Sequence, residues 1–299
     1  MSVKIFSEKI DEKLVQEGFI KCVDEDTFTF LNGKKEFFSE WEFIRVFDKE
    51  DTCLYEGFFQ NEKRNGYGKE YYPGKGSYKG YFENDKRNGH GEFFYDDGDY
   101  YIGNHVNDTF TGEGEIKYNN GNSYKGEFSN NRIFGNGEYT FSNGDIAKGF
   151  FTNGELNGEG ELLYKDGNHY TGNFANDIFQ GNGKYESNTG EIYTGEFSND
   201  YFHGHGEMKE KSGNVYTGQF IFGKYHGKGL LSYPDGRTYE GHFKKSVKHG
   251  QGVFKWPDGD IYKGQWINGV RHGVGYKTKG DVTKKVIYHY NKKKSEVVV

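Results

Sequence analysis

One pattern of 23 residues recurs ten times in phase, and it constrains this chain of 299 residues more than any other feature. Each copy begins with a tyrosine, followed two residues later by glycine and two further on by an aromatic residue, as in Tyr193, Gly195 and Phe197. The first copy starts at Tyr55 and the last at Tyr262. A fixed period of this size is typical of repeat architectures, in which each unit packs against its neighbours.

Two copies depart from the pattern, and a second signal runs through all ten. His105 stands where other copies have phenylalanine or tryptophan, and Ala147 replaces the tyrosine of its copy. With the tyrosine counted as position 0, a Gly-x-Gly pair occupies positions +11 and +13 in every copy. A phosphate-binding glycine loop needs a strand followed by a helix, and no helical periodicity accompanies these glycines. The glycines therefore indicate packing, not nucleotide binding.

Each period predicts two β-strands. Positions 0, +2 and +4 share one face of the first strand, and positions +11 to +17 share one face of the second. Between +17 and the next tyrosine lies a short x-Asp/Asn-Gly segment, which predicts a three-residue loop: a type I turn followed by a left-handed glycine. The three prolines, Pro73, Pro234 and Pro257, all fall at the first central position of this turn.

The glycines predict gaps that aromatic rings can cover. We expect position +2 to pair with +13 and position +4 with +11, so that each ring lies over or beside a residue without a side chain. A single repeat buries too little surface to offset its conformational entropy, so stability must come from stacking. The expected fold is all-β: an elongated twisted ribbon of about ten stacked 23-residue hairpins with a small N-terminal cap.

Residues outside the repeats form two further segments. Residues 1–54 are expected to cap the first hairpin, with a short helix within 9–18, a hairpin around Asn32-Gly33 and a strand near 41–46. The ten repeats occupy residues 55–280. Residues 281–299 are expected to contain a closing strand at 286–290 and a basic, solvent-exposed tail.

Composition favours a chain in a reducing compartment. Aromatic residues make up 18% of the sequence, so the expected core consists of rings more than of aliphatic side chains. Two cysteines, Cys22 and Cys53, make a disulfide framework unexpected. The opening residues lack the apolar core of a signal peptide, and no apolar run approaches membrane-spanning length. We therefore expect a cytoplasmic protein.

The pattern Tyr-x-Gly-x-Phe, a polar turn, Gly-x-Gly and then Asp-Gly resembles the membrane occupation and recognition nexus (MORN) repeat. The segment from Tyr239 to Gly259 is similar to a complete copy, and the resemblance covers about three quarters of the chain. It implies β-hairpin repeats that serve as a scaffold. Chains that consist almost entirely of such repeats resemble radial-spoke-head proteins of cilia and cytoskeletal scaffolds of protists. Glycan- or choline-binding aromatic repeats of bacterial surfaces are similar only loosely.

Residues that suggest catalysis or metal binding have simpler interpretations here. Histidine recurs at +10 in four consecutive copies, but successive copies lie two strands apart, about 9.6 Å, too far for one coordination shell. The segment from Asp96 to Asp99 lacks the ligand spacing of a calcium loop and favours a turn. We expect no enzyme activity, no cofactor, no metal site and no nucleic-acid partner.

Charge is unevenly distributed along the chain. Lysines and arginines against aspartates and glutamates give −16 over residues 1–200 and +10 over residues 201–299. A basic C-terminal part favours an acidic partner. The candidate binding residues are Lys224, Lys228, Lys244, Lys245, Lys248, Arg271, Lys277, Lys279, Lys284 and Lys285. Head-to-tail contact of the chain with itself is an alternative use of the same asymmetry.

Two functions remain open from the sequence. The first is a non-enzymatic scaffold in a ciliary, axonemal or other cytoskeletal assembly, with protein subunits bound along the ribbon and a homodimer possible. The second is a peripheral adaptor that binds anionic phospholipid through the basic C-terminal repeats. Reversing Lys244, Lys245 and Lys248 to glutamate is expected to weaken partner binding without disturbing the fold.

Overall fold

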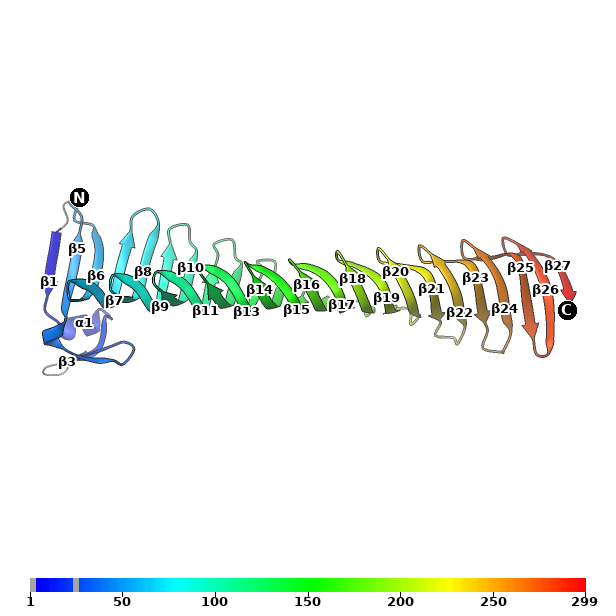
Figure 1. Cartoon of the computed structure of the whole chain (residues 1–299), viewed down its shortest axis with the longest axis horizontal. Coiled ribbons are helices and arrows are strands. Elements are labelled where there is room, and N and C mark those ends of the chain that lie inside the picture. The colour runs from blue at the N-terminus through cyan, green and yellow to red at the C-terminus, as the bar shows by residue number, and fades with distance from the viewer. Residues whose placement is uncertain (1–3, 24–26) are drawn as a thin grey trace. The chain divides into compact units, whose positions relative to one another are not determined.

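The computed structural model describes residues 4–23 and 27–299, almost all of them in antiparallel β-strands (Figure 1). It divides into two compact units, Met1–Gly144 with Phe150–Gly154, and Asp145–Gly149 with Glu155–Val299. The elements before the repeats are β1 (Lys4–Glu8), α1 (Glu12–Gln16), β2 (Ile20–Val23), β3 (Thr27–Phe30), β4 (Lys35–Phe37), the 3-10 helix η1 (Phe38–Glu40) and β5 (Glu42–Phe47). The side chains of Cys22, Phe37 and Phe38 lie outside the described part.

The repeats form successive hairpins, which confirms the predicted all-β fold class. In the first unit they are β6–β7 (Cys53–Gln60, Lys63–Tyr72), β8–β9 (Gly76–Glu83, Lys86–Tyr95), β10–β11 (Tyr100–Val106, Thr109–Lys117) and β12–β13 (Ser123–Ser129, Arg132–Thr140). The division between the units falls in β14–β15 (Ile146–Thr152, Glu155–Leu163). The second unit continues with β16–β17 (His169–Ala175, Ile178–Glu186), β18–β19 (Ile192–Ser198, Tyr201–Lys209), β20–β21 (Val215–Ile221, Lys224–Ser232), β22–β23 (Thr238–Lys244, Val247–Lys255), β24–β25 (Ile261–Ile267, Val270–Lys279) and β26–β27 (Val282–His289, Lys292–Val298).

The register within a hairpin agrees with the predicted glycine pair but not with the predicted aromatic pair. Gly195 at +2 lies opposite Gly206 at +13, as expected. Phe197 at +4, however, lies opposite Phe202 at +9, because a bulge intervenes after the glycine pair. The glycine at +11, Gly204, has a φ of +54° and instead faces Phe220, the +4 residue of the next repeat.

Two kinds of turn connect the strands. The predicted three-residue loop is present: Gly213 donates to the carbonyl of Glu210 at 2.8 Å and has a φ of +84°. The other turn, within each repeat, is a two-residue turn with positive φ at both central residues, as at Asn199 (49°) and Asp200 (66°). Such type I′ turns match the twist of a hairpin, and asparagine, aspartate and glycine tolerate them best.

The two-residue turns also join neighbouring repeats. The amide of Asp200 donates to the carbonyl of Phe179 in the preceding repeat at 3.2 Å, while its carboxylate accepts the amide of Phe179 at 2.8 Å. Asp108 makes the same two contacts with Arg87, at 3.0 and 2.9 Å. A polar residue at +7 can thus satisfy both main-chain groups of residue +9 one repeat earlier, whereas Gly154, Gly223 and Gly269 at this position donate only their amides.

One face of the sheet, here called the ring face, carries positions 0, +2, +4, +9 and +13. Tyr193 is fully buried there and stacks on Phe202 with centroids 4.0 Å apart, while Phe197 and Phe220 meet it edge-on. A Cβ built on Gly206 would come within 2.5 Å of the Tyr193 hydroxyl. The tyrosine ring therefore lies directly over the paired glycines, as the sequence predicted.

The opposite face, here called the open face, carries positions +1, +3, +12 and +14, and the cap covers only its first strands. Phe58 at +3 and Tyr67 at +12 are buried beneath α1 and the small sheet β2–β4. Phe28 of the cap stacks on Phe58 at 5.1 Å, and Tyr81 accepts the Asn32 amide at 2.6 Å. The aromatic residues at +3 and +12 of these first copies thus form the surface against which the cap packs.

Candidate interaction surface

Two of the ten candidate basic residues pack among the aromatic rings of the ring face. Lys248 occupies position +9, where the three preceding repeats carry an aromatic residue, and its ammonium lies 4.6 Å from the ring centroid of Phe254. Three more rings, Tyr233, Tyr239 and Trp266, surround it at 5.1–5.2 Å. Burial lowers the pKa of Lys248 to about 8, while the four rings favour its charged form.

Arg271 has a similar place in the last full repeat. Its guanidinium lies 4.4 Å from the ring centroid of Tyr288 and donates to the Asn291 amide oxygen at 3.1 Å. Lys248 and Arg271 are thus packing residues, which removes the basis for expecting that reversal of Lys248 leaves the fold undisturbed. A glutamate at position 248 would put a carboxylate among rings, so the fold would not tolerate that reversal.

Five other candidates are scattered over both faces and one edge. Lys277 and Lys284 stand on the ring face and form ion pairs with Asp260 at 3.3 Å and Glu296 at 3.5 Å. Lys228 and Lys285 lie on the open face, opposite His242 and Tyr276. Lys279 is the last residue of β25, at the turn that leads to β26. The structure does not bring these five side chains into one site.

Lys224, Lys244 and Lys245 do come together. All three are exposed at the edge formed by the two-residue turns, and Lys245 is itself a central turn residue with a φ of 53°. The next residue, Ser246, donates its amide to the Tyr225 carbonyl at 2.9 Å and accepts the Tyr225 amide at 3.1 Å. These bonds hold the turn of one repeat beside Lys224 of the preceding repeat.

Exposed aromatic side chains share this edge, and they were missed in the sequence analysis. Phe222 is 67% exposed and meets Tyr201 edge-on at 5.8 Å. It occupies the first central turn position with a φ of 49°, a conformation rarely adopted by bulky residues. Eight other repeat turns have asparagine there, so the break in that pattern was a usable signal. We call Tyr201, Ile221, Phe222, Lys224, Lys244 and Lys245 the aromatic–basic turn surface.

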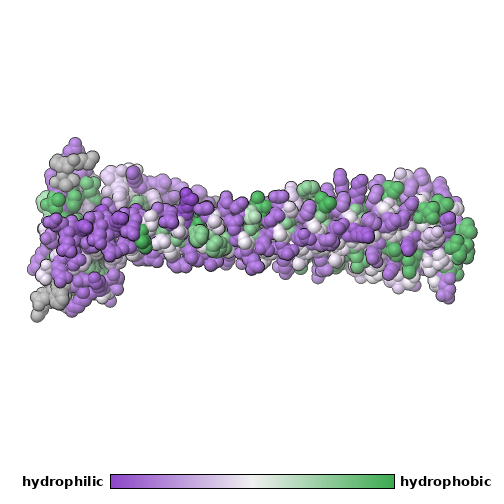
Figure 2. All heavy atoms as spheres, viewed as in Figure 1, coloured by the Kyte–Doolittle hydropathy of each residue, from purple (hydrophilic) through white to green (hydrophobic). Residues whose placement is uncertain are grey.

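A shallow groove on the open face lies within the same repeats. Lys228, Leu230, Glu240, Val253 and Lys263 line a volume of about 530 Å³. Charged and apolar side chains alternate across successive strands: Leu230 faces Glu240, Glu240 faces Val253, and Val253 faces Lys263. Figure 2 likewise shows hydrophobic residues dispersed among hydrophilic ones on the face in view. This composition suits a protein surface better than a small-molecule pocket.

The histidines at +10 contribute through their main chain. The carbonyls of His203 and His226 accept the hydroxyls of Tyr193 and Tyr216 at 3.1 and 3.3 Å. Within residues 4–23 and 27–299, no group of three or more acidic, histidine or cysteine side chains is placed to hold a metal ion. Among the described helices, none has the length and apolar character needed to cross a membrane.

Comparisons with known proteins identify the repeat. The MORN repeat model matches residues 55–77, 78–100, 124–146, 148–169, 170–192, 193–215, 216–236, 239–261 and 262–281. Only the copy that contains His105 is not matched, although β10 and β11 form the same hairpin. The comparison with curated proteins found no match.

Two solved structures show remote likenesses to this chain. The TCP domain of SAS-4 (dCPAP) from Drosophila melanogaster, in complex with a proline-rich motif of Ana2, is 16% identical, with a TM-score of 0.34 over 51% of this chain and 83% of that one. The TCP10 domain of Danio rerio CPAP is 14% identical, with a TM-score of 0.27 over 67% and 90%. Neither carries an argument about function. The nine matched repeats cover most of the chain, which therefore belongs to the family of MORN-repeat proteins.

Proposed function

We propose that this protein is a non-enzymatic scaffold of a cytoskeletal assembly, such as a ciliary axoneme, and that it binds an acidic protein partner through the aromatic–basic turn surface. The observation that carries the proposal is Phe222, a large apolar side chain held in solvent at a turn position where eight of the ten repeats have asparagine. Its conformation costs on the order of 1 kcal/mol or more, and the fold gains no core contact in return.

The chemistry around Phe222 favours a macromolecular partner. Exposed aromatic residues that enter a pocket on a partner commonly dominate the binding energy of an interface. Lys224, Lys244 and Lys245 form no ion pair with another described residue, so their charge is available to an acidic surface. Such charges accelerate association and select the partner, and they are screened over about 8 Å at physiological salt.

The same surface supports the second function, an adaptor for anionic phospholipid. Aromatic residues beside lysines are also typical of segments that lie in a membrane interface, where each lysine contributes about 1 kcal/mol of attraction. The protein partner is the preferred reading because the surface sits on rigid hairpin turns and not on an amphipathic helix. Liposomes therefore belong in the same experiment.

Phe222→Asn tests the proposal without threatening the fold. Asparagine suits a positive φ, so the variant should be at least as stable as the wild type. If Phe222 is an interface anchor, capture of the partner should weaken by about 10- to 30-fold, or roughly 2 kcal/mol. The measurement is co-sedimentation of purified protein with detergent-extracted cytoskeletons and, separately, with liposomes that contain phosphatidylserine.

A charge-reversal pair completes the design. Lys224, Lys244 and Lys245 changed to glutamate should weaken binding and flatten its salt dependence. Lys209, Lys211 and Lys255 changed to glutamate alter the net charge equally but lie at the three-residue turns, so binding should persist. Binding to liposomes alone would favour the lipid adaptor. Cytoskeletal binding that survives Phe222→Asn would place the partner site elsewhere.

A further inference from the structure

The first and last strands of the sheet each leave one edge unpaired. In the described part of the chain, β5 pairs with β1 on one side and β6 on the other, whereas β1 pairs only with β5. Among the strands that the structure describes, the last one, β27, pairs only with β26. A strand with a free edge presents main-chain donors and acceptors that can pair with another chain.

Both of these strands carry unusually exposed apolar side chains. On β1, Ile5 is 63% exposed and Phe6 is 53% exposed. On β27, Val297 and Val298 are 64% and 65% exposed. In Figure 2, hydrophobic spheres gather where Figure 1 draws β1, and again where it draws β26 and β27. On the open face of interior strands, the side chains of Phe94, Phe150 and Tyr276 are 40–44% exposed, which is below all four of these values.

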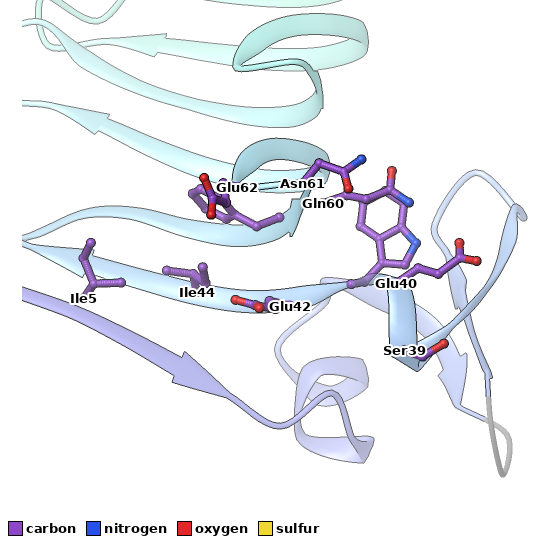
Figure 3. Close-up of a pocket in the computed structure, with 10 residues that line it drawn as sticks. Ile5, Ser39, Glu40, Glu42, Ile44, Gln60, Asn61 and Glu62 are labelled. Atoms are coloured by element: carbon purple, nitrogen blue, oxygen red, sulfur yellow. The ribbon is translucent and has the colours of Figure 1, made fainter.

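The two edges also differ in charge. Beside β1, a groove of about 800 Å³ is lined by Ile5, Ile44 and Phe59, with Glu40, Glu42 and Glu62 around it (Figure 3). These three glutamates are exposed and form no ion pair with another described residue. The β27 strand begins with Lys292, Lys293 and Lys294, of which only Lys293 has an ion pair, to Glu296.

We infer that β27 of one copy of this protein adds to β1 of a second copy, so that copies join head to tail. An antiparallel register that sets Ile5 beside Val298 also sets Phe6 beside Val297, and it matches apolar residues on both faces of the sheet. The same register sets Ser295 beside Glu8 and Lys294 beside Lys9, so the lysines of β27 gain no acidic partner on β1. The apolar pattern on both faces therefore selects this alignment.

Contact between two different edges has a consequence for assembly. Each copy keeps one free β1 and one free β27 after joining, so the interface is heterologous and growth continues unless the copies close into a ring. Lysines at the start of β27 oppose pairing of β27 with unrelated edges, as charged residues on edge strands generally do. This inference concerns β1 and β27 and does not depend on the partner proposed for the turn surface.

Blocked variants of the full chain test the inference. Ile5→Lys blocks the head and Val298→Lys blocks the tail, and both changes lie at exposed positions that leave the ring face intact. Light scattering and analytical ultracentrifugation should show that the wild-type mass rises with concentration, while each variant alone remains a monomer. An equimolar mixture of the two variants should stop at a one-to-one pair, because it contains a single competent head and tail.

Other outcomes refute the inference. A wild-type protein that remains a monomer overturns it, and so does a dimer that survives in the Ile5→Lys variant, since that would be tail-to-tail pairing. Circular dichroism on every variant separates lost association from unfolding.

Discussion

Gly206→Ala tests whether the tyrosine rings depend on the glycines beneath them. Gly206 does not have a positive φ, so alanine is conformationally allowed there. Its added Cβ would lie 2.5 Å from the hydroxyl of Tyr193, 2.6 Å from Cε2 and 2.7 Å from Cζ, and the ring supplies all three nearest contacts. The ring has no room to withdraw, because Phe197, Phe202 and Phe220 enclose it.

The expected loss follows from that geometry. Forcing one methyl group into a packed site costs about 1–3 kcal/mol. Complete expulsion of Tyr193 would expose about 150–250 Å², or about 4–6 kcal/mol, which sets an upper bound. A displaced ring would also lose its hydrogen bond to the Glu196 carbonyl at 2.8 Å, worth about 1 kcal/mol. We therefore expect Gly206→Ala to lower the free energy of unfolding of this repeat by about 2–3 kcal/mol.

The assay must resolve single repeats, because arrays need not unfold in one step. Native-state hydrogen exchange at amides of β18 and β19 should show the loss, with β10 and β11 as the internal reference. The matched background is Tyr193→Ala: with the ring gone, Gly206→Ala should be neutral or stabilising by up to about 1 kcal/mol, because alanine is less flexible than glycine. A coupling energy near zero between the two changes would refute the ring-over-glycine account.

Three further predictions address positions where the array departs from its pattern or depends on its turns. His105 is 1% exposed, and burial lowers its pKa to about 4. As pH falls from about 6.5 to 4, the free energy of unfolding of the wild type, measured with urea, should therefore decrease by up to about 3 kcal/mol relative to that of His105→Phe. Leu156 reaches within 2.8 Å of a Cβ built on Gly149 and so fills the place of the missing tyrosine. Ala147→Tyr should therefore stabilise the fold only in combination with Leu156→Phe, and thermal unfolding of that double variant should show a gain of about 1–3 kcal/mol. Asp200→Ala should cost about 0.5–1.5 kcal/mol and accelerate amide exchange at Phe179, which loses its acceptor.

The sequence predicted the repeating part of the fold because its period is strict. Side-chain spacing of two residues assigns Tyr193, Gly195 and Phe197 to one face whatever the tertiary context. The three-residue loop before each tyrosine was equally determined, since Gly213 and its equivalents need a left-handed conformation. The alignment of +4 with +11 failed because a bulge adds a residue to one strand and shifts the register, and the glycine that permits the bulge is also compatible with a regular ladder.

The interaction surface was less accessible from sequence. Net charge drew attention to the C-terminal repeats, but charge alone does not reveal which lysines pack inward, and Lys248 occupies an aromatic position of the ring face. The tail was expected to be solvent-exposed, and its side chains are, but the main chain forms β27. The β1 strand has no periodic signal of its own and depends on its pairing with β5.

The two kinds of position in the repeat explain where function can vary. On the ring face, each tyrosine contacts glycines and rings of its own and neighbouring repeats, so a change there spreads through several packed residues. At the two-residue turns, asparagine is favoured only because φ is positive. A different side chain at that position points into solvent, at a local cost of about 1–2 kcal/mol. Phe222 shows that the array tolerates this cost, since Tyr216 and Phe220 beside it keep full burial. A uniform scaffold can therefore acquire a specific partner by changing a single turn, and the turns are where further binding sites on this array should be sought.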